Sequence, residues 1–225
     1  MKQDRSILQT AQLKPMITSL DQLDLQKKYS YADYLTWNLR ERVELLRGYV
    51  RKMAPAPSDE HQRISSFLHG TIWYHLRRKK CEVRHAPYDV RLIIPSDTPL
   101  SSRRRKSATT LSDEEIETVV QPDILVVCDS TKIDNRGCLG APDLIIEILS
   151  RGNNKEDTEE KFTIYESAGV PEYWIVHPYE QTITVYRPDS SGRYAGSRPF
   201  APGSQLTSDI LKELEIPVAE VFDRK

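Results

Sequence analysis

Two short apolar runs with acidic residues at their edges constrain this chain more than any other feature. The first run follows Asp123 within residues 121–127, and the second contains Glu147 within residues 141–149. Short, unbroken stretches of Ile, Leu and Val are typical of central strands that are covered on both faces. A carboxylate buried in such a strand without a partner would cost several kcal/mol. The pattern therefore predicts a buried acidic site on neighbouring strands.

Length and composition indicate one soluble domain. The 225 residues can form one large core, and 29% charged with 38% hydrophobic residues is typical of a globular protein. No apolar run approaches the ~20 residues that span a bilayer, and the polar first residues do not resemble a secretory signal. We therefore expect a cytoplasmic protein with no membrane contact, made of an N-terminal arm (residues 1–28) and one domain (residues 29–225).

The cysteines and the net charge exclude some classes of site. Cys81, Cys128 and Cys138 are too widely spaced for a zinc knuckle, and we expect them to be reduced and structural. The formal net charge of -1 gives no overall attraction to nucleic acid. Any binding of nucleic acid would then depend on local basic patches.

Periodicity and turn residues predict an α/β domain in which helices flank a mixed sheet. Two helices open at serine caps, one from Ser30 to Trp37 and one from Ser58 to about Lys80, and a third covers residues 155–168 before Gly169. The expected strands are a hairpin at 42–51, a pair at 81–85 and 88–94, two central strands at 124–128 and 143–149, and a hairpin at 172–177 and 181–187. The polar stretch of residues 95–119 is long for a connection, so we expect a flexible surface loop there.

Asp123 and Glu147 are the best candidates for metal ligands. Hydrolysis of a phosphodiester needs an activated water and a way to offset charge in the transition state, and Mg²⁺ bound by hard oxygen ligands supplies both. Asp123 has an alternative as a turn residue that bonds to the backbone. Glu147 lies inside an apolar strand, so a metal or a lysine is needed to explain it. Asp143, at the start of the same run, is better explained as a turn residue.

Lys161, Glu44 and His61 are further candidates. Lys161 lies on the helix expected over the acidic strands, where its ammonium could act on the attacking water or on the phosphate. Its alternative is a surface pair with Asp157, four residues earlier. Glu44 could instead lie on a solvated face, and His61 could simply belong to the first turn of its helix.

The succession of short motifs resembles one known family. The motifs are YADYL at residues 31–35, VELLRG at 43–48, MAPAP at 53–57 with His61, QPD at 121–123, PDLIIEILS at 142–150, and KFTIYESAGVPEYWIV at 161–176. In this combination, over residues 30 to 187, the chain resembles the Uma-two family of restriction-endonuclease-like proteins, which belongs to the PD-(D/E)XK nuclease superfamily.

The resemblance implies a restriction-endonuclease-like mixed β-sheet flanked by helices, and a site that uses Mg²⁺, with Mn²⁺ as an alternative. Asp123 then matches the PD carboxylate and Glu147 the acidic residue of the second strand. The lysine expected two residues after Glu147 is absent, because Leu149 stands there, and the resemblance implies that Lys161 replaces it. Glu44 and His61 match the N-terminal positions. His177 departs from the family, in which most members carry Asp.

Two classes of function compete. The first is a Mg²⁺-dependent endonuclease that cleaves DNA, and an RNA-directed nuclease is a weaker variant of it. Because each site cuts one strand, double-strand cleavage would favour a homodimer. The second is a catalytically weak binding or assembly module with the nuclease fold, in which basic runs at residues 77–80 and 103–106 grip phosphates. Such runs are also common on solvated surfaces. No G-x-S-x-G elbow, P-loop or dinucleotide fingerprint is present.

Overall fold

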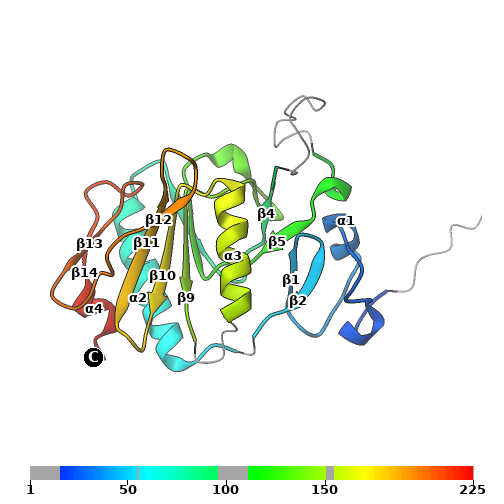
Figure 1. The fold of residues 1–225 in the computed structure, drawn as a ribbon, viewed down its shortest axis with the longest axis horizontal. Coiled ribbons are helices and arrows are strands. Elements are labelled where there is room, and N and C mark those ends of the chain that lie inside the picture. Colours follow the sequence, from blue (N-terminus) through cyan, green and yellow to red (C-terminus); the bar gives the residue numbers. More distant parts are fainter. Residues whose placement is uncertain (1–15, 55, 96–110, 151–154, 225) are drawn as a thin grey trace, which may run out of the picture.

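Most of the described strands form two six-stranded mixed sheets, with helices around and between them, and β13 (Gln205–Thr207) and β14 (Glu215–Pro217) form a separate two-stranded sheet (Figure 1). A computed structural model describes residues 16–54, 56–95, 111–150 and 155–224. The first sheet has the order β2 (Tyr49–Lys52), β1 (Val43–Leu46), β5 (Thr118–Val120), β4 (Val90–Leu92), β8 (Gly137–Leu139) and β7 (Ile133–Asp134). The second has the order β12 (Tyr194–Gly196), β11 (Thr182–Pro188), β10 (Glu172–His177), β9 (Leu144–Ile148), β6 (Ile124–Val127) and β3 (Glu82–His85).

The predicted α/β class with mixed strand directions is confirmed. Most neighbouring strands run antiparallel, but β4 pairs with β8 and β9 pairs with β10 in the parallel direction. The predicted hairpin at Gly48 is present, with positive φ angles of 52° at Arg47 and 91° at Gly48. Positive φ at both central residues is the geometry of the tight turn that best matches the twist of two paired strands.

Helix α2 (Asp59–Leu76) covers one face of the second sheet. The Ser58 side chain accepts a hydrogen bond from the backbone N–H of His61 and so caps the first turn. Its apolar stripe, Ile64, Leu68 and Ile72, is fully buried against Val126 and Ile146 of the sheet. The spacing of these residues positions His61, one turn before Ile64, at the same buried face.

Helix α3 (Lys155–Ala168) lies between the two sheets (Figure 1). Ile164 and Tyr165 belong to a buried cluster that joins Leu46 of the first sheet to Leu125 and Ile145 of the second. The helix ends as predicted at Gly169, where φ is 76° and the N–H of Val170 bonds to the carbonyl of Tyr165.

The N-terminal segment covers the outer face of the first sheet. Ser30 caps the short helix α1 (Tyr31–Tyr34), which ends before the predicted Trp37. Tyr31 is buried with Leu45 and Val119 of the sheet. Within the described part of the predicted arm, Leu23, which follows the 3-10 turn η1 (Leu20–Gln22), is buried in the same cluster.

The predicted pairing of residues 81–85 with 88–94 is wrong. β3 pairs with β6 in the second sheet, whereas β4 pairs with β5 and β8 in the first. The chain passes from the second sheet to the first between β3 and β4. The alternation of apolar and polar residues within a strand does not specify which strand it pairs with. The predicted loop at 95–119 is also too long at its C-terminal end. The 3-10 turn η3 (Asp113–Glu115) and the start of the buried strand β5 lie within that range. Residues 96–110, with the basic run at 103–106, lie outside the described residues.

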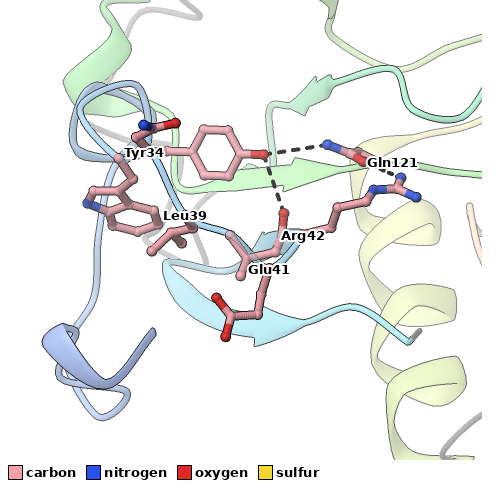
Figure 2. Close-up of a pocket in the computed structure, with 8 residues that line it drawn as sticks. Tyr34, Leu39, Glu41, Arg42 and Gln121 are labelled. Atoms are coloured by element: carbon pink, nitrogen blue, oxygen red, sulfur yellow. Dashed lines mark hydrogen bonds between the residues drawn. The ribbon is translucent and has the colours of Figure 1, made fainter. Parts of the chain in front are cut away.

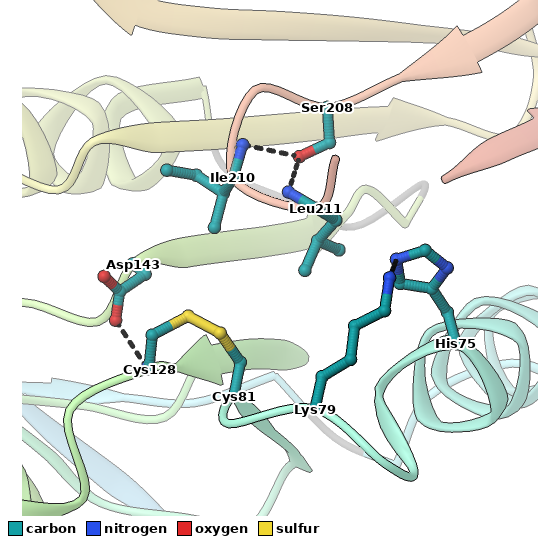
Figure 3. The surroundings of a disulfide bond; sticks show 8 residues. All are labelled: His75, Lys79, Cys81, Cys128, Asp143, Ser208, Ile210 and Leu211. Carbon is teal, nitrogen blue, oxygen red and sulfur yellow. Dashed lines mark hydrogen bonds between the residues drawn. A yellow bond between two sulfur atoms is a disulfide. The ribbon is translucent and has the colours of Figure 1, made fainter. Parts of the chain in front are cut away.

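The expectation that all cysteines are reduced is wrong for two of them. Cys81 and Cys128 form a disulfide (Figure 3), whereas Cys138 is free and buried. Glu82 pairs with Val127 at the end of the β3–β6 ladder, so continuing that register places the two cysteines opposite each other. The pairing follows from strand register, which the spacing of cysteines in the sequence does not reveal.

The C-terminal residues complete the core on the α2 side. The hairpin of β13 (Gln205–Thr207) and β14 (Glu215–Pro217) leads into α4 (Val218–Phe222). Leu206, Ile216 and Val221 are buried in the same cluster as the stripe of α2. Among the described residues, no helix is both long and apolar enough to span a membrane.

Candidate active site

Strand pairing brings the two candidate metal ligands together. Ile124 of β6 pairs with Ile146 of β9 in an antiparallel ladder. Continuing the register by one residue places Asp123 opposite Glu147, and opposite residues in such a ladder have neighbouring side chains. Asp123 Oδ2 accepts a hydrogen bond of 2.8 Å from the backbone N–H of Ile148. The expected neighbourhood of Asp123 and Glu147 is therefore present in the fold.

His61 contacts Asp123 from the N-terminal end of α2. Its Nε2 lies 3.1 Å from Asp123 Oδ2, and the residue is only 8% exposed. Burial works to lower the pKa of His61, but the hydrogen bond and charge of Asp123 prevail and raise it. The contact with Asp123 therefore makes the imidazole easier to protonate than a free histidine side chain.

Lys161 lies between two carboxylates that come from different sheets. Its Nζ is 2.9 Å from Glu44 Oε1 on β1 and 3.2 Å from Glu147 Oε1 on β9. The predicted position of Lys161 over the acidic strands is confirmed. These contacts replace the alternative in which it pairs with Asp157 on the helix surface.

The facing of the strands explains how Glu44 and Glu147 meet. Glu44 points to the same side of β1 as Leu46, which is buried between the sheets. Glu147 points to the same side of β9 as Ile145, which belongs to that cluster too. We call the boundary between the two sheets the seam. Each sheet contributes one glutamate to it, Glu44 or Glu147, and Lys161 of α3 lies between the two.

Two groups in the site were not predicted from the sequence. Tyr165, one turn after Lys161, donates a hydrogen bond of 2.7 Å to Glu147 Oε1. The backbone N–H of Gln121 donates a bond of 2.7 Å to Glu44 Oε1. A tyrosine at helical spacing is more often a core residue, and a peptide N–H leaves no trace in the sequence. The four-residue step from Lys161 to Tyr165 is the one signal that was available.

The electrostatics of the site come from burial and close pairing. Burial raises the pKa of Glu147 to about 7, even though the Lys161 ammonium acts in the opposite direction. Burial alone would lower the pKa of Lys161, but the carboxylates of Glu147 and Glu44 raise it above the usual lysine value. The carboxylates of Glu44, Asp123 and Glu147 therefore meet around the Lys161 ammonium and the His61 imidazole.

The donor chemistry fits the divalent cation that the resemblance implies. Asp123 Oδ1 and Glu147 Oε2 take part in none of the hydrogen bonds that the described residues form at this site. The part of the chain that the structure describes has no group of three or more His, Cys, Asp or Glu side chains arranged for a metal. Mg²⁺ needs only one or two carboxylates, because water and phosphate oxygens complete its shell. Asp123 and Glu147 meet that requirement.

Other predicted groups lie apart from this site. Asp143 Oδ2 accepts a hydrogen bond from the backbone N–H of Cys128 at 2.7 Å, as expected for a structural turn residue. In the basic run at residues 77–80, the Arg77 guanidinium lies 3.7 Å from the centre of the Tyr74 ring. Arg77 ends α2, whereas His61 begins it, so this run lies at the far end of the helix.

Comparison with known proteins agrees with this description. The chain matches the Uma2 family, described as "Putative restriction endonuclease", over residues 31–219. A crystal structure from Anabaena variabilis, described as a "putative nuclease belonging to DUF820", superposes with a TM-score of 0.62 at 18% identity, covering 86% of this chain and 97% of the other. No curated protein matches the chain.

At that identity the Anabaena structure establishes the fold, while the family match extends over most of the sequence and includes Glu44, His61, Asp123, Glu147 and Lys161. The chain belongs to the Uma2 family of restriction-endonuclease-like proteins.

Proposed function

We propose that this protein is a Mg²⁺-dependent endonuclease that hydrolyses phosphodiester bonds of DNA. The observation that carries the proposal is the placement of the half-buried Lys161 between Glu44 and Glu147, with Asp123 beside Glu147. The family and the Anabaena structure, both described in nuclease terms, support this reaction class. DNA rather than RNA is favoured by the restriction-endonuclease description of the family.

In this proposal Asp123 and Glu147 would hold the cation, which would be Mg²⁺ or, alternatively, Mn²⁺. Such a cation lowers the pKa of bound water and offsets charge on the phosphate. His61 holds Asp123 through Nε2, and Tyr165 holds Glu147 through its hydroxyl. Each carboxylate keeps one oxygen outside these hydrogen bonds. The hydrogen bonds therefore fix the carboxylates before any ligand arrives.

Lys161 supplies positive charge beside the reacting phosphate. Its ammonium has three N–H donors, of which Glu44 and Glu147 take two. The remaining donor can orient the attacking water or bond to a phosphate oxygen in the transition state. Glu44 contributes by keeping Lys161 charged and in place, as the raised pKa of Lys161 indicates.

The test is the nicking of supercoiled plasmid by purified protein with Mg²⁺, with Mn²⁺ and with EDTA. We expect nicked circles with either metal and intact plasmid in EDTA. Asp123→Asn and Glu147→Gln proteins, shown to be folded by circular dichroism, should lose this activity.

Three results would reject the proposal. Nicking that persists in both variants would mean that another site, or a contaminant, cleaves. Intact plasmid under every condition, together with cleavage of a matched RNA, would replace DNA by RNA as the substrate. Metal-independent, salt-sensitive binding of DNA without cleavage would favour the binding module instead. Linear product formed early would support a dimer that cuts both strands.

A further inference from the structure

Arg51 on β2 places a positive charge beside the candidate active site. It pairs with Glu44 in the β1–β2 ladder, and the side chains of such a pair point to the same face of a sheet, with Cβ atoms ~4.5–5.5 Å apart. Val50, the preceding residue, pairs with Leu45 and is buried with it in the cluster on the opposite face. Arg51 therefore faces the seam, as Glu44 does.

The guanidinium of Arg51 contacts the helix that carries Lys161. Its Nε and Nη2 donate to Glu160 Oε2 at 3.3 and 3.2 Å, and Glu160 directly precedes Lys161 on α3. Lys161 in turn contacts Glu44, the strand partner of Arg51. Arg51 and Lys161 are therefore neighbouring cations at the seam.

The two cations differ in their access to solvent. The side chain of Lys161 is 16% exposed, whereas that of Arg51 is 40% exposed. Glu160 takes two of the five N–H donors of the guanidinium, and the hydrogen bonds between described residues use no others. The remaining donors include the fork of Nη1 and Nη2, which matches two oxygens of a phosphate. Arg51 can therefore bind an anion at the rim of the site without leaving Glu160.

Two exposed cations close to Arg51 in the fold point elsewhere. Lys52 pairs with Val43, which is buried on the outer face of the first sheet, so its side chain points away from the seam. Arg42 donates to the Gln121 side chain at 2.5 Å, beside a cavity of about 230 Å³ whose wall includes Tyr34 (Figure 2). Tyr34 packs against the same outer cluster as Val43. Of these three cations, only Arg51 faces the seam.

We propose that Arg51 binds a phosphate next to the cleaved one on the substrate strand. A strand whose reacting phosphate lies at Lys161 carries further phosphates on both sides of it, one for every ~3.4 Å of duplex axis. The carboxylates of the seam repel these phosphates, and a guanidinium at the rim offsets that repulsion. The formal net charge of -1 provides no general attraction, so binding depends on local cations of this kind. This inference rests on the proposed function, because it assigns Arg51 to the substrate of that reaction.

The experiment measures DNA binding without cleavage. The fluorescence anisotropy of a fluorescein-labelled DNA duplex reports binding in EDTA over a series of KCl concentrations. Arg51→Gln should bind about tenfold more weakly than wild type, as the loss of a charge-assisted hydrogen bond would give. Its plot of log Kd against log [KCl] should also be shallower by about 0.9, which corresponds to one phosphate contact fewer.

Two matched variants remove the same charge at the positions that point elsewhere. Lys52→Gln changes the next residue on β2, and Arg42→Gln changes the cation beside the outer cavity. Both proteins should bind the duplex within twofold of wild type and keep the wild-type salt dependence.

Glu160→Gln distinguishes a phosphate contact from a structural tie between β2 and α3. It breaks the ion pair with Arg51 but keeps the charge of the guanidinium. We expect this variant to bind the duplex as tightly as wild type or more tightly. If Arg51→Gln does not fold, the double variant Arg51→Gln, Glu160→Gln, which removes both charges of the pair, should show the tenfold loss.

Binding by Arg51→Gln within twofold of wild type would overturn the proposal. An equal loss in Glu160→Gln or in Lys52→Gln would overturn it too, because the first would mark a structural tie and the second a general effect of charge. Absence of binding by the wild type in EDTA would have the same meaning. Because the assay contains no metal and measures no cleavage, its failure leaves the nicking test unaffected, and the reverse holds too.

Discussion

Lys161 is the residue on which the site depends, because it is the cation between two carboxylates that α3, β1 and β9 bring together. Its side chain is 16% exposed, and those of Glu44 and Glu147 are 6% and 14% exposed. Removal of one member of a buried ion pair leaves the other charge without compensation, and this usually costs more than the pair itself contributes.

We therefore expect Lys161→Met to lower the free energy of unfolding by about 3 kcal/mol. Addition of Glu44→Gln should recover part of this loss, because it removes one of the stranded charges. Urea unfolding followed by circular dichroism measures both effects. Lys52→Met, at an exposed position on β2, is the matched control and should unfold with the wild type. Unfolding of Lys161→Met at the wild-type midpoint would contradict this role.

At the residue scale, the sequence allowed the side chains of the site to be predicted, but not the backbone groups that bond to them. Acidic residues in apolar runs pointed to Asp123 and Glu147, because a buried charge needs an explanation. Glu44, His61 and Lys161 were weaker candidates on their own, since each has an ordinary explanation, and the resemblance strengthened them. The N–H groups of Gln121 and Ile148 that hold Glu44 and Asp123 could not be foreseen, because every residue except proline has one.

At the scale of elements, Glu172 on β10 joins the C-terminal hairpin to the second sheet. The residue is fully buried, and its carboxylate accepts bonds from Trp174, Arg187 and Ser208 side chains and from the backbone N–H of Asp209. Ser208 and Asp209 directly follow β13, so this one carboxylate fixes the start of the segment that carries the rest of the C-terminal core.

Glu172→Gln should therefore lower the free energy of unfolding by about 3 kcal/mol, because an amide group cannot accept from all four donors and leaves Arg187 with a weaker partner. Thermal and urea unfolding both report this loss. Glu180→Gln makes the same substitution on the exposed turn after β10 and should have no measurable effect. A loss below 1 kcal/mol for Glu172→Gln would show that the segment is held by apolar packing alone.

The elements that could be predicted are those with strong local patterns. The helices α2 and α3 and the strands β6 and β9 follow from apolar periodicity and from caps. β5 was missed because its three residues follow an acidic, polar stretch, and its burial comes from pairing with β1 and β4. The pairing of β3 with β6 rather than with β4 depends on tertiary contacts, which alternation does not specify.

At the scale of the whole molecule, the site lies in the seam between two sheets, and α3 connects the walls. A disulfide between Cys81 and Cys128, at a sequence separation of 47, ties β3 to β6 at the edge of one of those sheets. Closure of a loop of this length in the unfolded chain stabilises a fold by ~2–4 kcal/mol.

Unfolding without reductant should expose one reactive thiol, that of Cys138, and unfolding with reductant should expose all three. Reduction should also lower the urea midpoint, and a Cys81→Ser, Cys128→Ser protein should unfold at the reduced midpoint with or without reductant. Mass spectrometry after alkylation counts the thiols. Three thiols without reductant would contradict the disulfide and restore the expectation that all three cysteines are reduced.

The most direct test of the candidate nuclease site compares two identical substitutions in one plasmid-nicking assay with Mg²⁺. Glu147→Gln removes a carboxylate charge inside the seam, and Glu180→Gln removes one on the surface. We expect an initial rate reduced about 100-fold or more for Glu147→Gln and a rate within twofold of wild type for Glu180→Gln. Equal rates for the two variants, with wild type active, would contradict the assignment of the site and place the nicking activity elsewhere.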